Sequence, residues 1–87
     1  KIMTLLAPSG GPMFAVRLHL DSRNRAYVIR RAGTSGWEAR LEEDGRAPRV
    51  DCDRDWHRVE RALARFEREV TELTEHGWQV ASVDIRH

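Results

Sequence analysis

Between residues 53 and 78, apolar residues recur at alternating steps of three and four, which is the spacing of one face of an amphipathic helix. The pattern predicts a helix of about 22 residues, roughly twice the average length in globular proteins. Asp53 is suited to cap its start, and Gly77 to end it in a left-handed conformation that brings Trp78 close to Leu73. The predicted apolar face consists of Trp56, Val59, Leu63, Phe66, Val70 and Leu73.

Shorter segments outside this helix have the alternation, or the β-branched and aromatic residues, of strands. Polar turn residues at 21–24 and the Asp44-Gly45 pair separate them, which favours antiparallel hairpins. Pro48 restricts the fourth strand to a sheet edge or a bulge. The predicted strands are Phe14–Leu20, Ala26–Arg31, Trp37–Glu43, Ala47–Cys52 and Gln79–Ile85.

The resulting order ββββαβ predicts an α+β domain, in which an antiparallel meander of four to five strands packs one face against the long helix. The helix would span about 33 Å and a strand about 24 Å, so part of the apolar stripe would extend beyond the sheet. The expected core comprises Phe14, Val16, Leu18, Tyr27, Ile29, Leu41, Val59, Leu63, Phe66, Val70 and Leu73.

Residues 1–12 differ in composition from the rest of the chain. A short apolar run is followed by a proline- and glycine-rich stretch at 8–12, which is typical of a linker. We therefore expect residues 1–12 to be a flexible leader or linker, and residues 13–87 to form a single α+β domain. The alternative is that the first residues add a short edge strand.

A second stripe on the predicted helix consists of arginines placed two residues after each apolar position. Two residues correspond to a rotation of about 200°, so this stripe lies nearly opposite the apolar face. Arg54, Arg58 and Arg61 have no acidic residue three or four positions further on, and they lie near the positive end of the helix dipole. Such a stripe is either a solvated face or a basic surface kept for an anionic partner.

Few residues are spaced for catalysis or metal binding. Cys52 is the only cysteine, which excludes an intramolecular disulfide. Asp51, Asp53 and Asp55 share the spacing that opens a calcium loop, but the glycine and the final glutamate of that loop are missing, so capping explains them better. We expect no metal, no cofactor, no enzymatic activity and no small-molecule substrate. The histidines, which lie far apart, are His19, His57, His76 and His87.

The net charge is only +1, so composition alone does not indicate a nucleic-acid partner. Lys1 is the only lysine among the basic residues. Arginine suits bidentate contacts with phosphate or carboxylate, but a high-GC bacterial genome produces the same bias, and we prefer that interpretation. No segment resembles a membrane span or a complete signal peptide, so we expect a cytoplasmic protein.

The run Ile29-Arg30-Arg31-Ala32-Gly33-Thr34-Ser35-Gly36 resembles the motif Trp-Gly-Arg-x-Gly-x-x-Gly of WGR domains. Arg31, Gly33 and Gly36 match, whereas Ile29 and Arg30 stand where the family has tryptophan and glycine. Ala62, Phe66 and the Gly77-Trp78 pair are similar to the helical half of that family. The resemblance implies a small α+β domain that binds DNA or DNA ends.

These observations predict a non-enzymatic binding or regulatory domain. The first hypothesis is nucleic-acid binding, with contacts from Arg30, Arg31 and Arg40 near the glycine-bounded loop and from Arg54, Arg58 and Arg61 on the helix. The alternative is a protein-interaction or homodimerisation module without a nucleic-acid role. We also expect a homodimer, either around Val70 and Leu73 or along an open sheet edge, against the alternative of a monomer.

Overall fold

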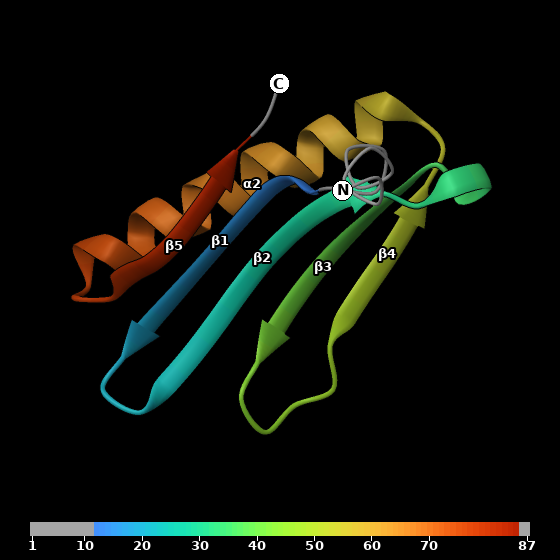
Figure 1. Cartoon of the computed structure of the whole chain (residues 1–87). Helices are drawn as coiled ribbons and strands as arrows, with labels where there is room; N and C mark the ends of the chain where they lie inside the picture. Colours follow the sequence, from blue (N-terminus) through green and yellow to red (C-terminus); the bar gives the residue numbers. More distant parts are fainter. Residues whose placement is uncertain (1–11, 86–87) are drawn as a thin grey trace, which may run out of the picture.

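A computed structural model of the chain describes residues 12–85, apart from the side chains of Pro12 and Ser35. Its strands form one antiparallel five-stranded sheet in the order β4-β3-β2-β1-β5, and a single long helix, α2, crosses one face diagonally (Figure 1). The predicted α+β fold with the order ββββαβ is confirmed. Most of the predicted leader and His87 lie outside the described residues.

The boundaries of two strands agree with the sequence prediction, and the others shift by a few residues. The turn between the first two strands contains only Asp21 and Ser22, and Asp21 has a positive φ of 55°, so the second strand begins at Arg23. The elements are β1 (Pro12–Leu20), β2 (Arg23–Arg31), the 3₁₀ helix η1 (Gly33–Ser35), β3 (Trp37–Glu43), β4 (Arg49–Asp53), α2 (Trp56–Glu75) and β5 (Gln79–Ile85).

Strand register decides which side chains share a face of the sheet. Residues directly opposite one another on antiparallel strands point to the same side. Phe14 is opposite Ile29 and Val16 is opposite Tyr27, and all four are buried beneath α2. The alternate residues of these strands therefore form a second face, which no other element of the described chain covers (Figure 1).

The core is centred on Phe66 of α2. Its ring meets Tyr27 edge-on with centroids 4.9 Å apart, and lies 6.5 Å from the ring of Phe14. Edge-to-face contacts of this kind add to the free energy of apolar burial. Leu41, Leu63, Val70 and Leu73 are half-buried around this cluster, whose fully buried members are Phe14, Val16, Leu18, Tyr27, Ile29, Val59, Phe66 and Trp78.

The helix begins two residues later than its sequence suggests. Asp55, rather than Asp53, is the N-cap, and its carboxylate accepts a hydrogen bond of 2.9 Å from the backbone N–H of His57. Asp53 instead ends β4, and its carboxylate accepts from the backbone N–H of Asp55 at 2.9 Å. Asp53 thus shapes the turn that places Asp55, and Asp55 caps the helix.

The predicted helix ending is confirmed. Gly77 has a φ of 98°, a left-handed conformation that would strain another residue, and its N–H donates to the carbonyl of Thr74 at 3.2 Å. The N–H of Trp78 donates to the carbonyl of Leu73 at 3.0 Å, which completes a Schellman motif. This turn directs the buried Trp78 ring under the sheet and starts β5 beside β1.

Because Phe66 joins the helix to β1 and to the central strand β2, we expect Phe66→Ala to lower the free energy of unfolding by about 3–5 kcal/mol. Such a loss approaches the whole stability of many small domains. Chemical denaturation followed by circular dichroism measures it. The neighbouring Glu67→Ala, at an exposed helical position, is the control and should change stability by less than about 0.5 kcal/mol. Equal melting of Phe66→Ala and the parent would contradict this packing.

Candidate functional site

Five arginines are exposed along α2 and its N-terminal turn, and two of them, Arg58 and Arg65, lie on the flank of the helix beside β3 and β4 rather than opposite the core. We call these residues the arginine ridge: Arg54, Arg58, Arg61, Arg65 and Arg68. Arg58 lies 3.6 Å from the carboxylate of the half-buried Asp53, and because Arg58 itself is exposed, this pair holds the arginine weakly. Within residues 12–85, Arg54 and Arg61 have no carboxylate within ion-pair distance, so their guanidinium groups remain available to a ligand.

The ridge starts beside an aromatic pair at the end of the sheet. Trp37 and Trp56 have ring centroids 4.8 Å apart, and the guanidinium of Arg31 lies 5.1 Å from the Trp37 ring. Gly36 brings this loop against the helix start, because a Cβ there would lie 2.5 Å from the carbonyl oxygen of Asp53. The loop that contains Arg31 and the start of the ridge are thus held together by packing.

The structure separates the arginines that the sequence analysis grouped. Arg30 and Arg40 lie on the uncovered face of the sheet, whereas Arg31 lies on the helix side. Arg30 pairs with Glu38 at 2.9 Å. Arg40 pairs with Glu42 at 2.9 Å and lies 3.7 Å from Glu38. The six predicted arginines therefore do not share one surface, because alternate strand residues point to opposite faces.

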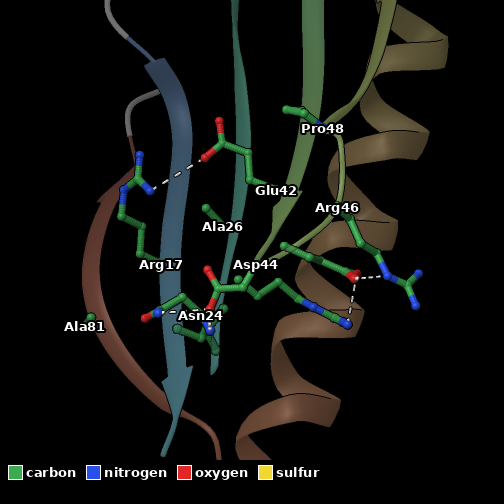
Figure 2. A pocket seen from close by; sticks show the side chains of 11 residues that line it. Arg17, Asn24, Ala26, Glu42, Asp44, Arg46, Pro48 and Ala81 are labelled. Carbon is green, nitrogen blue, oxygen red and sulfur yellow. Dashed lines mark hydrogen bonds and ion pairs between the residues drawn. The ribbon is translucent and has the colours of Figure 1, made fainter. Parts of the chain in front are cut away.

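A hollow of about 460 Å³ lies on the uncovered face, where small residues are surrounded by longer ones (Figure 2). Ala26 forms part of its floor, opposite Arg17 on one neighbouring strand and Glu42 on the other, which lie 3.7 Å apart. At its lower end, the backbone and side-chain nitrogens of Asn24 donate to the carboxylate of Asp44 at 2.8 and 3.1 Å. The polar groups at its rim thus hold one another.

Tyr27 carries a polar network into the core. Its hydroxyl donates to the carboxylate of Glu69 at 2.9 Å and accepts from Arg25 at 3.2 Å, and Arg25 pairs with Glu43 at 3.0 Å. Burial raises the pKa of Tyr27 above its ordinary value of 10.0; the hydrogen bond from Arg25 opposes the shift and that to Glu69 adds to it. The network joins α2 to β2 through the hydrogen bond between Tyr27 and Glu69.

The other candidate residues for chemistry are dispersed. Cys52 is exposed on β4. His57 lies 3.5 Å from Glu60 and His76 bonds to the carbonyl of Glu72, so each has a local partner on the helix. Among residues 12–85, no group of histidine, cysteine or acidic side chains could hold a metal ion. Within the same residues, no helix combines the length and apolar character needed to cross a bilayer.

The predicted interface residues Val70 and Leu73 are half-buried against the core of their own domain. Larger apolar exposure lies on the outer strand β5, where Val80, Val83 and Ile85 are 43%, 56% and 45% exposed. The exposure of these three side chains could not be predicted from sequence, because it depends on the place of the strand in the sheet.

Comparison of the chain with models of protein families, with curated proteins and with solved structures found no match.

The single tyrosine allows the buried network to be tested directly. We expect the ultraviolet absorbance of tyrosinate to appear at higher pH in the folded protein than in denaturant, because burial raises the pKa of Tyr27. Since the folded-state pKa exceeds the unfolded one, this stabilisation is complete below pH 10 and is lost as the pH rises through the folded-state value.

Glu69→Gln should lower the pH at which Tyr27 ionises, because its carboxylate contributes to the upward shift. The titration is read over the range in which circular dichroism shows a folded protein. Equal midpoints in folded and denatured protein would contradict the network.

Proposed function

We propose that this chain is a small non-enzymatic binding domain that contacts a nucleic acid through the arginine ridge. The observation that carries the proposal is a contrast between two sets of arginines. On the uncovered sheet face, Arg17, Arg30 and Arg40 all lie within 3.7 Å of a glutamate. On the ridge, Arg54 and Arg61 have no such partner within the described residues.

Arg54 and Arg58 also lie beside the first turn of α2, where the helix dipole disfavours positive charge. Positive charge near a helix N-terminus costs a few tenths of a kcal/mol per residue at an exposed site. A bound phosphate would reverse that cost, because it supplies the negative charge that both the arginines and the helix start favour. The placement of Arg54 and Arg58 is therefore easier to explain with an anionic ligand than by stability of the isolated domain.

Nucleic acid is the anionic partner we favour because of the aromatic pair beside the ridge. The half-buried Trp37 and Trp56 rings, with Arg31 over Trp37, place stacking surfaces next to guanidinium groups. Proteins combine these two kinds of group to hold bases and phosphates together. Because residues 29–36 resemble the WGR motif, duplex DNA is the first nucleic acid to test for binding. We expect the domain to act in the cytoplasm of a bacterium.

Replacing Arg54, Arg58 and Arg61 by glutamine should weaken binding to duplex DNA, single-stranded DNA or RNA while leaving the domain folded. The dependence of log affinity on log salt should flatten by about one unit per lost phosphate contact. Filter binding or fluorescence anisotropy at about 50 and 200 mM salt measures both effects. The variant should also be slightly more stable, because the charges at the helix start are removed.

The matched control is the triple variant Arg17→Gln, Arg30→Gln and Arg40→Gln, which changes the net charge by the same amount on the opposite face. It should retain the binding of the parent. If both triple variants lowered the affinity for nucleic acid equally, the effect would come from net charge and not from the arginine ridge. Absence of binding by the parent at about 50 mM salt, with all three probes, would remove nucleic acid as the partner.

A further inference from the structure

The two edges of the sheet differ in the features that prevent edge-to-edge association. The five-residue β4 contains Arg49, Asp51 and Asp53, and Pro48 precedes it. Charged residues, proline and short length are the usual protections of an exposed strand edge. The seven-residue β5 contains one charged residue, Asp84, and no proline, lysine or arginine. Within residues 12–85, β5 pairs only with β1, so its outer backbone groups face no other strand.

The exposed side chains of β5 continue the core beyond the edge of the sheet. Val80 is opposite Leu18, Val83 opposite Val16 and Ile85 opposite Phe14. Because these partners on β1 are buried under α2, the exposed β5 side chains lie on the same, helix-covered side. An apolar surface thus runs outward from the core and ends at an open strand.

The flank of α2 nearest β5 extends this surface. Arg65 and Glu69 line a pocket with residues of β3 and β4, so they mark the other flank of the helix. Val70 and Leu63 lie about 40° and 60° from Phe66 in the opposite rotational direction, towards β1 and β5. Both are half-buried and pack against the core, so a strand beside β5 would find apolar side chains on the helix as well as on the sheet.

We propose that β5 pairs with β5 of a second copy of this chain, antiparallel and centred on Val83, so that two sheets join into one. This inference goes beyond the proposed nucleic-acid binding and does not depend on it. An antiparallel pair of identical strands has a two-fold axis, which is the symmetry of most homodimers. Such pairing would satisfy the outer backbone groups of β5 in both copies.

The sequence of β5 selects this register. Centring on Val83 places Val83 against its own copy on the helix side, and Ser82 against Asp84 on the uncovered side, where a hydroxyl can donate to a carboxylate. Centring on Asp84 would place two carboxylates directly opposite, which is destabilising. Centring on Ser82 would put Val80 opposite Asp84 and mix residues of the two faces.

A β-bulge limits how far the pairing extends. Arg17 is opposite Ser82 and Leu18 is opposite Val80, so Ala81 is an extra residue without a partner on β1. Bulges bend and twist an edge strand and end its regular pairing. The regular part of the strand pair therefore consists of residues 82–84, and Ile85 lies opposite the bulge residue Ala81 of the other copy.

Sedimentation equilibrium of the 87-residue chain over about a hundredfold range of concentration tests the proposal. We expect the parent to reach the mass of two chains, and Val83→Lys to remain at one chain, because two ammonium groups would meet at the axis. Val50→Lys is the matched control: Val50 is 42% exposed on β4, so the same substitution there should leave the dimer intact. A parent that keeps the mass of one chain, or a Val83→Lys variant that still dimerises, would overturn the proposal.

Cross-linking tests the register without relying on that variant. In a Cys52→Ser background, Val83→Cys should oxidise to a covalent dimer, because residues at the centre have Cα atoms about 4.5–5.5 Å apart, within the range of a disulfide. Gln79→Cys is the control, since its two copies would lie about 26 Å apart. We expect at least a tenfold faster cross-link for Val83→Cys, and equal rates would reject this register.

Discussion

The packing of the Phe66 ring against Tyr27 and Phe14 is the interaction on which the rest of the structure depends. It is where the helix meets the central strand β2 and its neighbour β1. Without it, the sheet would expose both faces, and a sheet of this kind needs at least one covered face for independent stability. The same contact orients α2, because the hydrogen bond from Tyr27 to Glu69 fixes the helix less than one turn beyond Phe66. The directions of the arginine ridge and of the flank near β5 follow from that orientation.

The low net charge of the chain hides an uneven distribution of charge over its surface. A charge of +1 argues against nucleic-acid binding only if the charges are evenly mixed. On the uncovered face they are mixed: arginines and glutamates alternate across neighbouring strands, and Glu38 lies within reach of both Arg30 and Arg40. On the N-terminal half of α2 the arginines instead follow one stripe, while Glu60 and Glu67 lie on another side of the helix; Glu69 and Glu72 join the arginine side only beyond Arg68. The ridge can therefore attract an anion locally although the whole chain is nearly neutral.

The sequence predicts those parts of the fold that depend on local physical rules. Trp37–Glu43 has its observed boundaries because Gly36 and the Asp44-Gly45 turn flank clean alternation, and Gln79–Ile85 begins directly after the Gly77 turn that ends the helix. Gly77 and Trp78 end the helix as expected, because few residues other than glycine adopt the required φ. The prediction of Asp53 as the N-cap was wrong. Asp53 and Asp55 are equally suited to that position by residue type, and only the path of β4 decides between them. Arg30 and Arg31 are neighbours in β2, so strand alternation alone places their side chains on opposite faces of the sheet.

The order of the strands is what the sequence could not supply, and it decides where contacts with other molecules can form. Nothing in Gln79–Ile85 tells whether it joins β1 or β4, since both neighbours would accept an antiparallel strand. Its place beside β1 puts an apolar, weakly charged strand at one edge and leaves the charged β4 at the other. Arg58 and Arg65 line pockets on the β4 side of α2, whereas β5 lies beyond the opposite flank. A two-fold contact along β5 would consequently leave both ridges uncovered on the same side of a continuous sheet, and one polyanion could contact two ridges at once, which raises avidity without any new contact.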